Sequence, residues 1–498
     1  MKFPVLLNVL GQSFTSKSNL LNTCFKIVLF CSLITLIFSC NQKTDKVSQI
    51  ETEKSIPVSI RVSQALKTSF DKYLIDTFLV ESNDTLITAN WLYQLFKKNE
   101  YNAIWTADSS LLPCADSLLS LIESAEDFGL FPETYNLNKI HVLVKHFTDT
   151  LHKEKNIASI RDINLLFSDA FFKMAIHLKK GRLDPDSLNC VWKGNSTDSN
   201  IVLLLNTAIS TNKIRQTLLS FEPEFEQYLL LKQHLNDQLD SGHYEKIVLN
   251  MERWRWEKHY YEDYRILINL PSYMMKYYAC DTLKLLSRII IGKPETPTPF
   301  RLNSKIVYFY VYPYWQVPLS IATKEILPSL KKDTAYLTKH NMELLDAYGT
   351  VIEHQGVNWK KYSEKYFPFK IRQRDGDDNT LGVLKFIFPN KFDIYLHDTN
   401  GRHLFNKEKR ALSHGCIRVK QSKKLAANLI DCCVINFNSD SLNLSLKNKQ
   451  RKKIDLFNRV PVHIRYFTSE VDSNKLLFYD DIYGLDKKMI ENLHSKEK

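Results

Sequence analysis

The chain has 498 residues, of which 44% are hydrophobic and 24% charged, so it is long enough for several domains and is not mainly disordered. Its formal net charge of +12 favours anionic partners such as a cell-wall polymer, a membrane surface or a nucleic acid. No zinc-finger spacing and no Arg-rich arm is present, so we expect no nucleic-acid partner. For the charge taken alone, a basic surface that keeps the protein soluble is the better explanation.

The N-terminal segment predicts export. Residues 1–39 contain three lysines and no acid, and Ile27–Phe38 is an apolar run of 12 residues. That run is short for a transmembrane helix but suits a signal-peptide core. It ends in "IFSC", which resembles a lipobox, so we expect cleavage before Cys40, acylation of its thiol, and a polar tether over residues 40–61. The alternative is an uncleaved membrane anchor. Either one places the remaining chain in the cell envelope, on the periplasmic side.

The cysteines predict neither a disulfide framework nor a metal site. Six of the nine would remain once residues 1–39 are removed and Cys40 is acylated, and they are scattered without a CxxC pair or a metal-ligand spacing. A single disulfide in an oxidising compartment stays open. We expect no metal and no cofactor.

The pattern changes from helical to β-rich along the chain. Residues 62–245 carry amphipathic stretches with helix-stop signals, such as two lysines followed by Gly181, and predict a helical domain. From about 260 onward, β-branched runs such as "DTLKLLSRIIIGK" are bounded by Pro and Gly and predict strands. We therefore expect an α+β protein with a β-rich domain over 246–315 and 380–498. A polar subdomain over 316–379 is inserted, in which residues 331–346 are expected to be helical.

One short stretch, "ALSHGCIRVK" (Ala411–Lys420), concentrates the chemistry. A cysteine nucleophile needs a thiolate, a base and donors for an oxyanion. Gly415 permits a tight turn before Cys416. A helix is expected soon after the cysteine, with Ser422 as its N-cap, and the N-terminus of that helix would lower the pKa of the Cys416 thiol. His397 ends a predicted strand and supplies a base. A buried structural cysteine, a disulfide and a zinc ligand are the alternatives.

The arrangement of a His, fifteen residues, "SHGC", an aliphatic residue and an Arg resembles the L,D-transpeptidase (YkuD-type) catalytic domain. The resemblance implies that Cys416 is the nucleophile and His397 the general base, that Gly415 and Cys416 amides form the oxyanion hole, and that His414 and Ser413 shape the loop. Arg418 and Tyr395 would hold substrate carboxylates. Either Asp398 or a backbone carbonyl would orient the base. The implied catalytic residues are Cys416, His397, His414 and Gly415, and the implied substrate-binding residues are Arg418, Tyr395, Ser413 and Asp398.

Blocks from about 90 to 490 resemble the large multidomain branch of this family, which has a helical scaffold domain and a cap inserted after "WQVP" (Trp315–Pro318). Only residues 222–248 bridge the scaffold and catalytic parts, so we expect the branch's peptidoglycan-binding module to be absent. The resemblance implies 3→3 cross-linking of peptidoglycan stem peptides with release of D-Ala, and a carbapenem adduct at Cys416. An L,D-carboxypeptidase or endopeptidase and a non-catalytic wall-binding lipoprotein are the alternatives.

Overall fold

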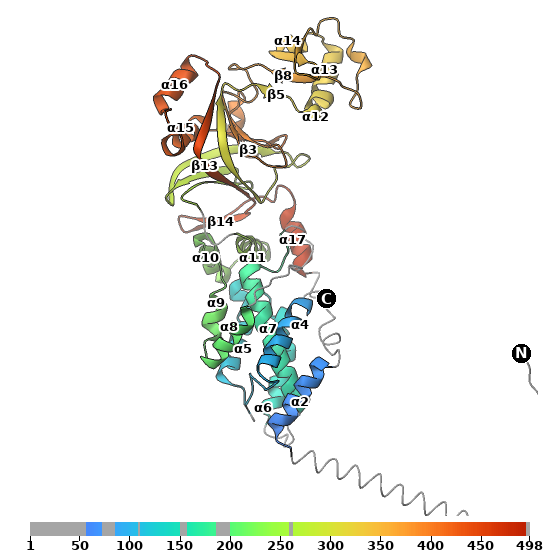
Figure 1. The fold of residues 1–498 in the computed structure, drawn as a ribbon, viewed down its shortest axis with the longest axis vertical. Coiled ribbons are helices and arrows are strands. Elements are labelled where there is room, and N and C mark those ends of the chain that lie inside the picture. Colours follow the sequence, from blue (N-terminus) through green and yellow to red (C-terminus); the bar gives the residue numbers. More distant parts are fainter. Residues whose placement is uncertain are drawn as a thin grey trace, which may run out of the picture.

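The computed structural model describes residues 56–71, 85–107, 110–149, 157–185, 200–257 and 262–494. A helical unit, a β-rich unit and a small inserted unit follow one another along the long axis of the molecule (Figure 1). The expected signal peptide and Cys40 lie outside the described residues. Within the described ranges, no helix combines the length and apolarity that crossing a bilayer requires.

The helical unit is organised around one long buried helix. Helix α7 has 24 residues, is buried over most of its length, and contacts α2, α4, α5, α6 and α9. The Asn164 side chain sits at its centre, where its oxygen accepts hydrogen bonds from the backbone N–H groups of Ile104 and Trp105 at 2.8 and 3.0 Å. The helices are α2 (Val58–Asp71), α4 (Thr85–Lys98), α5 (Pro113–Glu123), η1 (Ala125–Phe128), η2 (Pro132–Tyr135), α6 (Leu137–Thr148), α7 (Ile157–Lys180), α8 (Ile201–Ser210) and α9 (Ile214–Leu219).

The β-rich unit contains a nine-stranded sheet in the order β11-β3-β12-β10-β9-β4-β13-β1-β2, and β2 also pairs with β3, so the sheet closes on itself. Its interior is an aliphatic and aromatic core. The strands are β1 (Tyr264–Asn269), β2 (Met274–Ala279), β3 (Thr282–Gly292), β4 (Leu302–Val311), β9 (Leu384–Ile387), β10 (Leu396–His397), β11 (Ala411–Ser413), β12 (Ile417–Val419) and β13 (Lys452–Arg465). A helical unit followed by a β-rich unit confirms the predicted α+β class.

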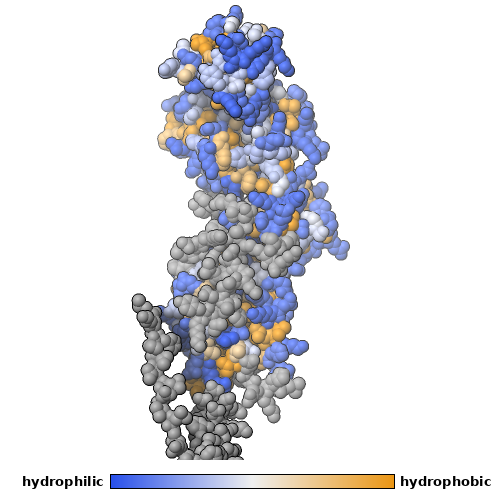
Figure 2. All heavy atoms as spheres, turned by 90° about the vertical axis from the view of Figure 1, so that its right-hand side faces the viewer, coloured by the Kyte–Doolittle hydropathy of each residue, from blue (hydrophilic) through white to orange (hydrophobic). Residues whose placement is uncertain are grey.

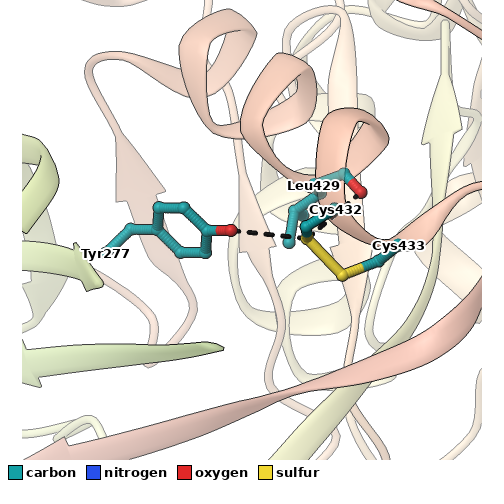
Figure 3. Close-up of a disulfide and its surroundings, with 4 residues drawn as sticks. All are labelled: Tyr277, Leu429, Cys432 and Cys433. Carbon is teal, nitrogen blue, oxygen red and sulfur yellow. Dashed lines mark hydrogen bonds between the residues drawn. A yellow bond between two sulfur atoms is a disulfide. The ribbon is translucent and has the colours of Figure 1, made fainter. Parts of the chain in front are cut away.

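Three helical segments belong to the β-rich unit: η6 (Arg402–Asn406), α15 (Ser422–Cys433) and α16 (Ser439–Lys447). At the C-terminal end of α15, Cys432 and Cys433 form a disulfide between adjacent residues (Figure 3). The Tyr277 hydroxyl donates a hydrogen bond to Cys432 Sγ at 3.4 Å. The sequence left room for one disulfide, and the structure assigns it to this pair.

The inserted unit has its own four-stranded sheet, in the order β5-β8-β6-β7, and its own apolar core. Figure 2 shows that hydrophilic residues predominate on this face of it, at the top of the molecule. The prediction of one helix over 331–346 is wrong. Asn341 adopts a left-handed φ of 53° after α14, and the chain then enters β6, which pairs with β8. The elements are β5 (Trp315–Gln316), α12 (Leu319–Ile321), the π-helical η4 (Ala322–Ile326), α13 (Leu327–Lys332), α14 (Tyr336–Lys339), β6 (Met342–Leu345), β7 (Val351–Ile352), η5 (Trp359–Lys361) and β8 (Lys370–Gln373).

Helices and a hairpin join the helical and β-rich units: α10 (Glu226–Gln233), η3 (His234–Asn236), α11 (Ser241–Arg255), β14 (Ser469–Asp472), β15 (Lys475–Phe478) and α17 (Leu485–His494). Residues 222–248 are thus taken up by α10, η3 and part of α11. The Trp254 ring of α11 stacks on Phe467 with centroids 4.4 Å apart, so this tryptophan packs the junction.

A buried ion pair fixes this junction. The Arg253 guanidinium on α11 donates to the Asp486 carboxylate on α17 at 2.6 Å, and both side chains are 6% exposed. Arg253 also donates to the Thr468 hydroxyl at 3.2 Å, and the neighbouring Asn250 exchanges hydrogen bonds with Thr468. Charges buried in this way are strongly destabilising once one partner is removed.

We expect Arg253→Met to lower the free energy of unfolding by about 3–5 kcal/mol, because Asp486 is then buried without its partner. Urea unfolding monitored by tryptophan fluorescence measures this. The double variant Arg253→Met/Asp486→Leu should recover much of the loss. The matched control is Lys324→Met, which breaks an ion pair with Glu364 whose side chains are both 61% exposed, and should change little. Equal effects of the two single variants would contradict the prediction.

Candidate active site

Strand register places the predicted site residues on one face of the closed sheet. Strand β10 pairs in parallel with β12, which puts His397 opposite Arg418, and antiparallel with β9, which puts His397 opposite Lys385. Residues opposite one another share a face, and side chains alternate between faces along a strand. Tyr395 and Cys416, two positions earlier on their chains, therefore lie on that same face. The intervening row fills the core and is fully buried: Leu396, Ile417 and Phe386.

The turn over residues 413–416, called the Cys416 turn below, is held in shape by hydrogen bonds of the Ser413 side chain. Its hydroxyl donates to the Cys416 carbonyl oxygen at 2.6 Å and accepts from the Gly415 N–H at 3.3 Å. Gly415 has a φ of 112°, which favours glycine. Ser413 is 2% exposed, so its hydroxyl is buried within the turn and bonds to the backbone of the turn itself.

A second loop, which contains Thr298, supports the Cys416 turn through hydrogen bonds. Thr298 Oγ1 donates to the Gly415 carbonyl oxygen at 2.7 Å and accepts from the Gly292 N–H at 2.9 Å. A Cβ on Gly292 would lie 2.2 Å from the Thr296 carbonyl oxygen and 3.0 Å from Gly415 Cα, so only glycine fits there. The Thr298 hydroxyl therefore connects the end of β3 to the turn that carries Cys416. The Tyr483 hydroxyl completes the support by donating to the Gly292 carbonyl oxygen at 2.8 Å.

His397 is neutral in this setting. The side chain is buried, and its Nδ1 makes no hydrogen bond to any of the described residues. Burial, and then the positive charge of Arg418, lower the pKa of His397 to about 3. The backbone groups of Asp398 and Leu381 lie close enough to oppose that lowering in part. A neutral imidazole can accept a proton, which is what a general base must do.

Asp398 does not orient His397 through its carboxylate. Its Oδ1 pairs with the Arg402 guanidinium, and its Oδ2 accepts from the Val383 N–H at 3.1 Å. Asp398 follows His397 directly on the chain, and because successive side chains alternate between the faces of a strand, its carboxylate lies on the face opposite to the imidazole. Of the two alternatives that the sequence left open, the Asp398 carboxylate is therefore engaged elsewhere, and orientation of His397 by a backbone carbonyl stays a prediction.

The helix N-terminus expected to activate Cys416 is absent from its vicinity, and that prediction is wrong. Strand β12 separates Cys416 from α15, and Ser422 is the first residue of α15 instead of its cap, because Gln421 occupies the N-cap position. Burial raises the pKa of the Cys416 thiol. A hydrogen bond from Tyr395 and the positive charges of Lys385 and Arg418 act in the opposite direction.

The inserted unit reaches the site at two points. His414 Nε2 lies 2.6 Å from the Glu325 carboxylate on η4, with both side chains partly exposed. Trp315, on β5, lies close enough to the Tyr395 hydroxyl to act on its pKa, as Cys416 also does. Sequence reasoning missed Glu325, Trp315 and Lys385. The one signal in the sequence was the alternation of apolar and charged residues in "LKF" (Leu384–Phe386), which indicates that Lys385 faces away from the core. In the described part of the chain, no three His, Cys, Asp or Glu side chains converge as a metal site.

We expect Thr298→Val to destabilise the protein by about 1–3 kcal/mol, because the Gly415 carbonyl and the Gly292 N–H lose their buried partner while the side-chain volume is kept. Thermal and urea unfolding measure the change. Thr298→Ser keeps the hydroxyl and is the matched control, for which we expect a smaller loss. A valine variant as stable as the wild type would refute the role of this hydroxyl.

We expect stability to fall with acidification in a way that depends on His397. Its pKa is about 3 in the folded protein and near 6.5 in the unfolded chain, so below about pH 6.5 the unfolded state binds the extra proton. Stability from this residue is complete above pH 6.5 and is lost progressively toward pH 3. At pH 5 the loss relative to pH 7 should be on the order of 1–2 kcal/mol.

The measurement is urea unfolding at pH 7 and pH 5 for the wild type and for His397→Gln, which cannot titrate. The variant should lose less stability between the two pH values. His403→Gln, at an exposed position of η6, is the control and should behave as the wild type does. A pH dependence that is unchanged in His397→Gln would show that another group is responsible.

Comparison with known proteins agrees with this geometry. Residues 90–235 match a family described as a scaffold domain, and residues 263–435, which include Cys416, match YkuD, described as the L,D-transpeptidase catalytic domain. A curated protein of Haemophilus influenzae, "Putative L,D-transpeptidase", is 34% identical over 250 residues, which is 50% of this chain and 50% of that protein. The chain therefore spans about half the length of the curated relative it matches.

A solved structure, "Structure of the Ldtfm-avibactam carbamoyl enzyme", aligns at 15% identity over 41% of this chain and 49% of that chain. Its TM-score of 0.16 is too low to bear on the fold. The two family matches follow the order of the helical and β-rich units, and the second contains every residue of the candidate site that the sequence predicted. This chain carries a scaffold domain followed by a YkuD-type L,D-transpeptidase catalytic domain.

Proposed function

We propose that the chain is a peptidoglycan L,D-transpeptidase that forms 3→3 cross-links between stem peptides through a cysteine acyl-enzyme and releases D-Ala. The observation that carries this proposal is the shared face on which a partly buried thiol, a neutral imidazole and a partly buried guanidinium lie together. The family match supplies the reaction class.

In the proposed first step, Cys416 Sγ attacks the carbonyl carbon that precedes D-Ala in the donor stem. A thioester bond forms, the carbon–nitrogen bond to D-Ala breaks, and His397 passes the thiol proton to the departing amine. In the second step, an amine of another stem attacks the thioester, an amide forms and the sulfur leaves as a thiol. The amine's proton passes through His397, so atoms and protons balance over the cycle.

The surrounding groups suit the charges that arise. We assign the amides of Gly415 and Cys416 to the oxyanion, where oriented backbone donors stabilise the developing charge. Arg418 is assigned to a substrate carboxylate. Its Nε is buried and has no hydrogen-bond partner among the described residues, and a guanidinium binds a carboxylate in a bidentate manner.

The proposed setting is the periplasmic side of the cell envelope, with the chain held at a membrane by a lipid on Cys40 or by an uncleaved anchor. The Cys432–Cys433 disulfide supports an oxidising compartment, because disulfides are rare in the cytosol. Peptidoglycan stem peptides are the proposed partners, and the net charge of +12 suits an anionic wall polymer.

We expect the full-length chain, purified in detergent and incubated with disaccharide-tetrapeptide stems, to yield a cross-linked dimer that has lost one D-Ala, detected by mass spectrometry. Cys416→Ala should yield none, because the acyl-enzyme cannot form. Cys280→Ala removes an exposed free cysteine and is the matched control, which should keep the activity.

Each other result selects an alternative. A tripeptide product that depends on Cys416 would mean that water accepts the acyl group, as in an L,D-carboxypeptidase. The absence of any product that depends on Cys416 would favour a wall-binding lipoprotein that does not catalyse the reaction.

A further inference from the structure

Lys385 is a partly buried cation beside the nucleophile, and the mechanism above does not use it. It lies on β9 opposite His397, on the face that carries Cys416. Its Nζ is 3.9 Å from the centroid of the Tyr395 ring, well within the range of a cation–π contact. Burial lowers the pKa of Lys385, and the charge of Cys416 opposes this. No ion pair of Lys385 with an acid occurs among the described residues.

The charged and titratable groups around Cys416 come from every element packed against it. Lys385 comes from β9, Arg418 from β12, and the neutral His397 from β10. His414, on the same turn, is turned toward the Glu325 carboxylate of the inserted unit. Among the described residues, Cys416 is the one charged group that acts on the pKa of Lys385 or of Arg418. The counter-charge for these two partly buried cations is therefore the thiolate itself.

Tyr395 connects Lys385 to the sulfur. Its hydroxyl lies close enough to Cys416 for each group to act on the pKa of the other. Burial, together with the charge of Cys416, raises the pKa of Tyr395, so the hydroxyl keeps its proton and can only donate to a thiolate. Trp315 also lies close enough to act on the pKa of this hydroxyl. A cation over the ring face withdraws electron density from the ring, which strengthens the hydroxyl as a donor.

We propose that Lys385 is a positioning residue that holds Tyr395 against Cys416 and, with it, stabilises the thiolate in place of an imidazolium at His397. The proposal rests on the proposed role of Cys416 as nucleophile. His397 remains the base that carries the proton during acyl transfer, but the negative charge on sulfur is held by the Lys385–Tyr395 pair. When the free enzyme is titrated with base, the thiol proton is released to solvent. During acyl transfer the attacking group starts as the thiol, and the same proton passes through His397 to the departing amine, as in the first step above.

The test measures the ionisation of Cys416 without any substrate. Full-length protein in detergent is alkylated with iodoacetamide between pH 5 and pH 10, and modification of the Cys416 peptide is followed by mass spectrometry. We expect Lys385→Met to move the midpoint of the rate profile up by about one pH unit and to slow alkylation at pH 7 about tenfold. Lys385→Arg, which keeps the charge, should restore most of the wild-type profile.

Lys391→Met is the matched control, because Lys391 also lies over an aromatic ring, that of Phe392 at 5.1 Å, but outside the site. Its midpoint should not move. His397→Gln should also leave the midpoint in place, whereas Tyr395→Phe should raise it. Should Lys385→Met not fold, Lys385→Gln removes the same charge and must give the same upward shift.

An unchanged midpoint in the folded Lys385 variant overturns the proposal, as does a midpoint that moves in His397→Gln as far as in Lys385→Met. The proposed function fails separately, because it is judged by the cross-linked product and alkylation requires no stem peptide. A shifted midpoint without any cross-linked dimer would support the role of Lys385 and count against transpeptidation.

Discussion

The alternation of side chains across β9, β10 and β12 is the constraint on which the rest of the site depends. One row, represented by Leu396, is buried in the core and fixes the register, because a slip of one residue would expose the apolar row and bury the polar one. Once the register is fixed, the residues that point to the other face of the sheet, His397, Arg418 and Lys385, necessarily lie opposite one another. Two or three residues of strand are enough here, since the closed sheet holds each of them on both sides. The hydrophobic core therefore determines the chemistry on the outside of the sheet.

The Cys416 turn is connected to the helical unit by a continuous series of hydrogen bonds. Tyr483 supports Gly292 behind the turn, and its own backbone N–H donates to the Tyr466 hydroxyl, which donates to Asp481. The Asp481 carboxylate accepts from the first N–H groups of α17, and α17 pairs with α11 through the buried ion pair described above. The junction helices α11 and α17 thus stabilise the segment that holds the turn, which gives them a part in positioning the nucleophile without contact with the thiol.

The sequence predicted the local features well and the long-range ones poorly. Cys416, Ser413 and Gly415 are neighbours on the chain, so a motif contains them together. Lys385 and Tyr483 come from strands and segments far away, and their approach depends on register and closure of the sheet, which no local pattern records. The helix expected after Cys416 does begin at Ser422, but the strand between them was missed for the same reason: β12 belongs to a parallel pair with β10, and its three residues do not stand out without their partner. Likewise, the local pattern of residues 331–346 is helical, and only pairing with the distant strand β8 makes residues 342–345 a strand.

The inserted unit contributes to the electrostatics of the site as well as to its shape. Glu325 pairs with His414 at the rim of the site, and in the described part of the chain no carboxylate forms an ion pair with Lys385. Trp315, by contrast, acts on Tyr395 and so on the thiol. Displacement of the unit would remove a donor from Tyr395 and would admit water around the two buried cations, which weakens their effect on a thiolate. The reactivity of the cysteine is therefore a property of the β-rich unit and the inserted unit together, and it is greatest when the two are in contact.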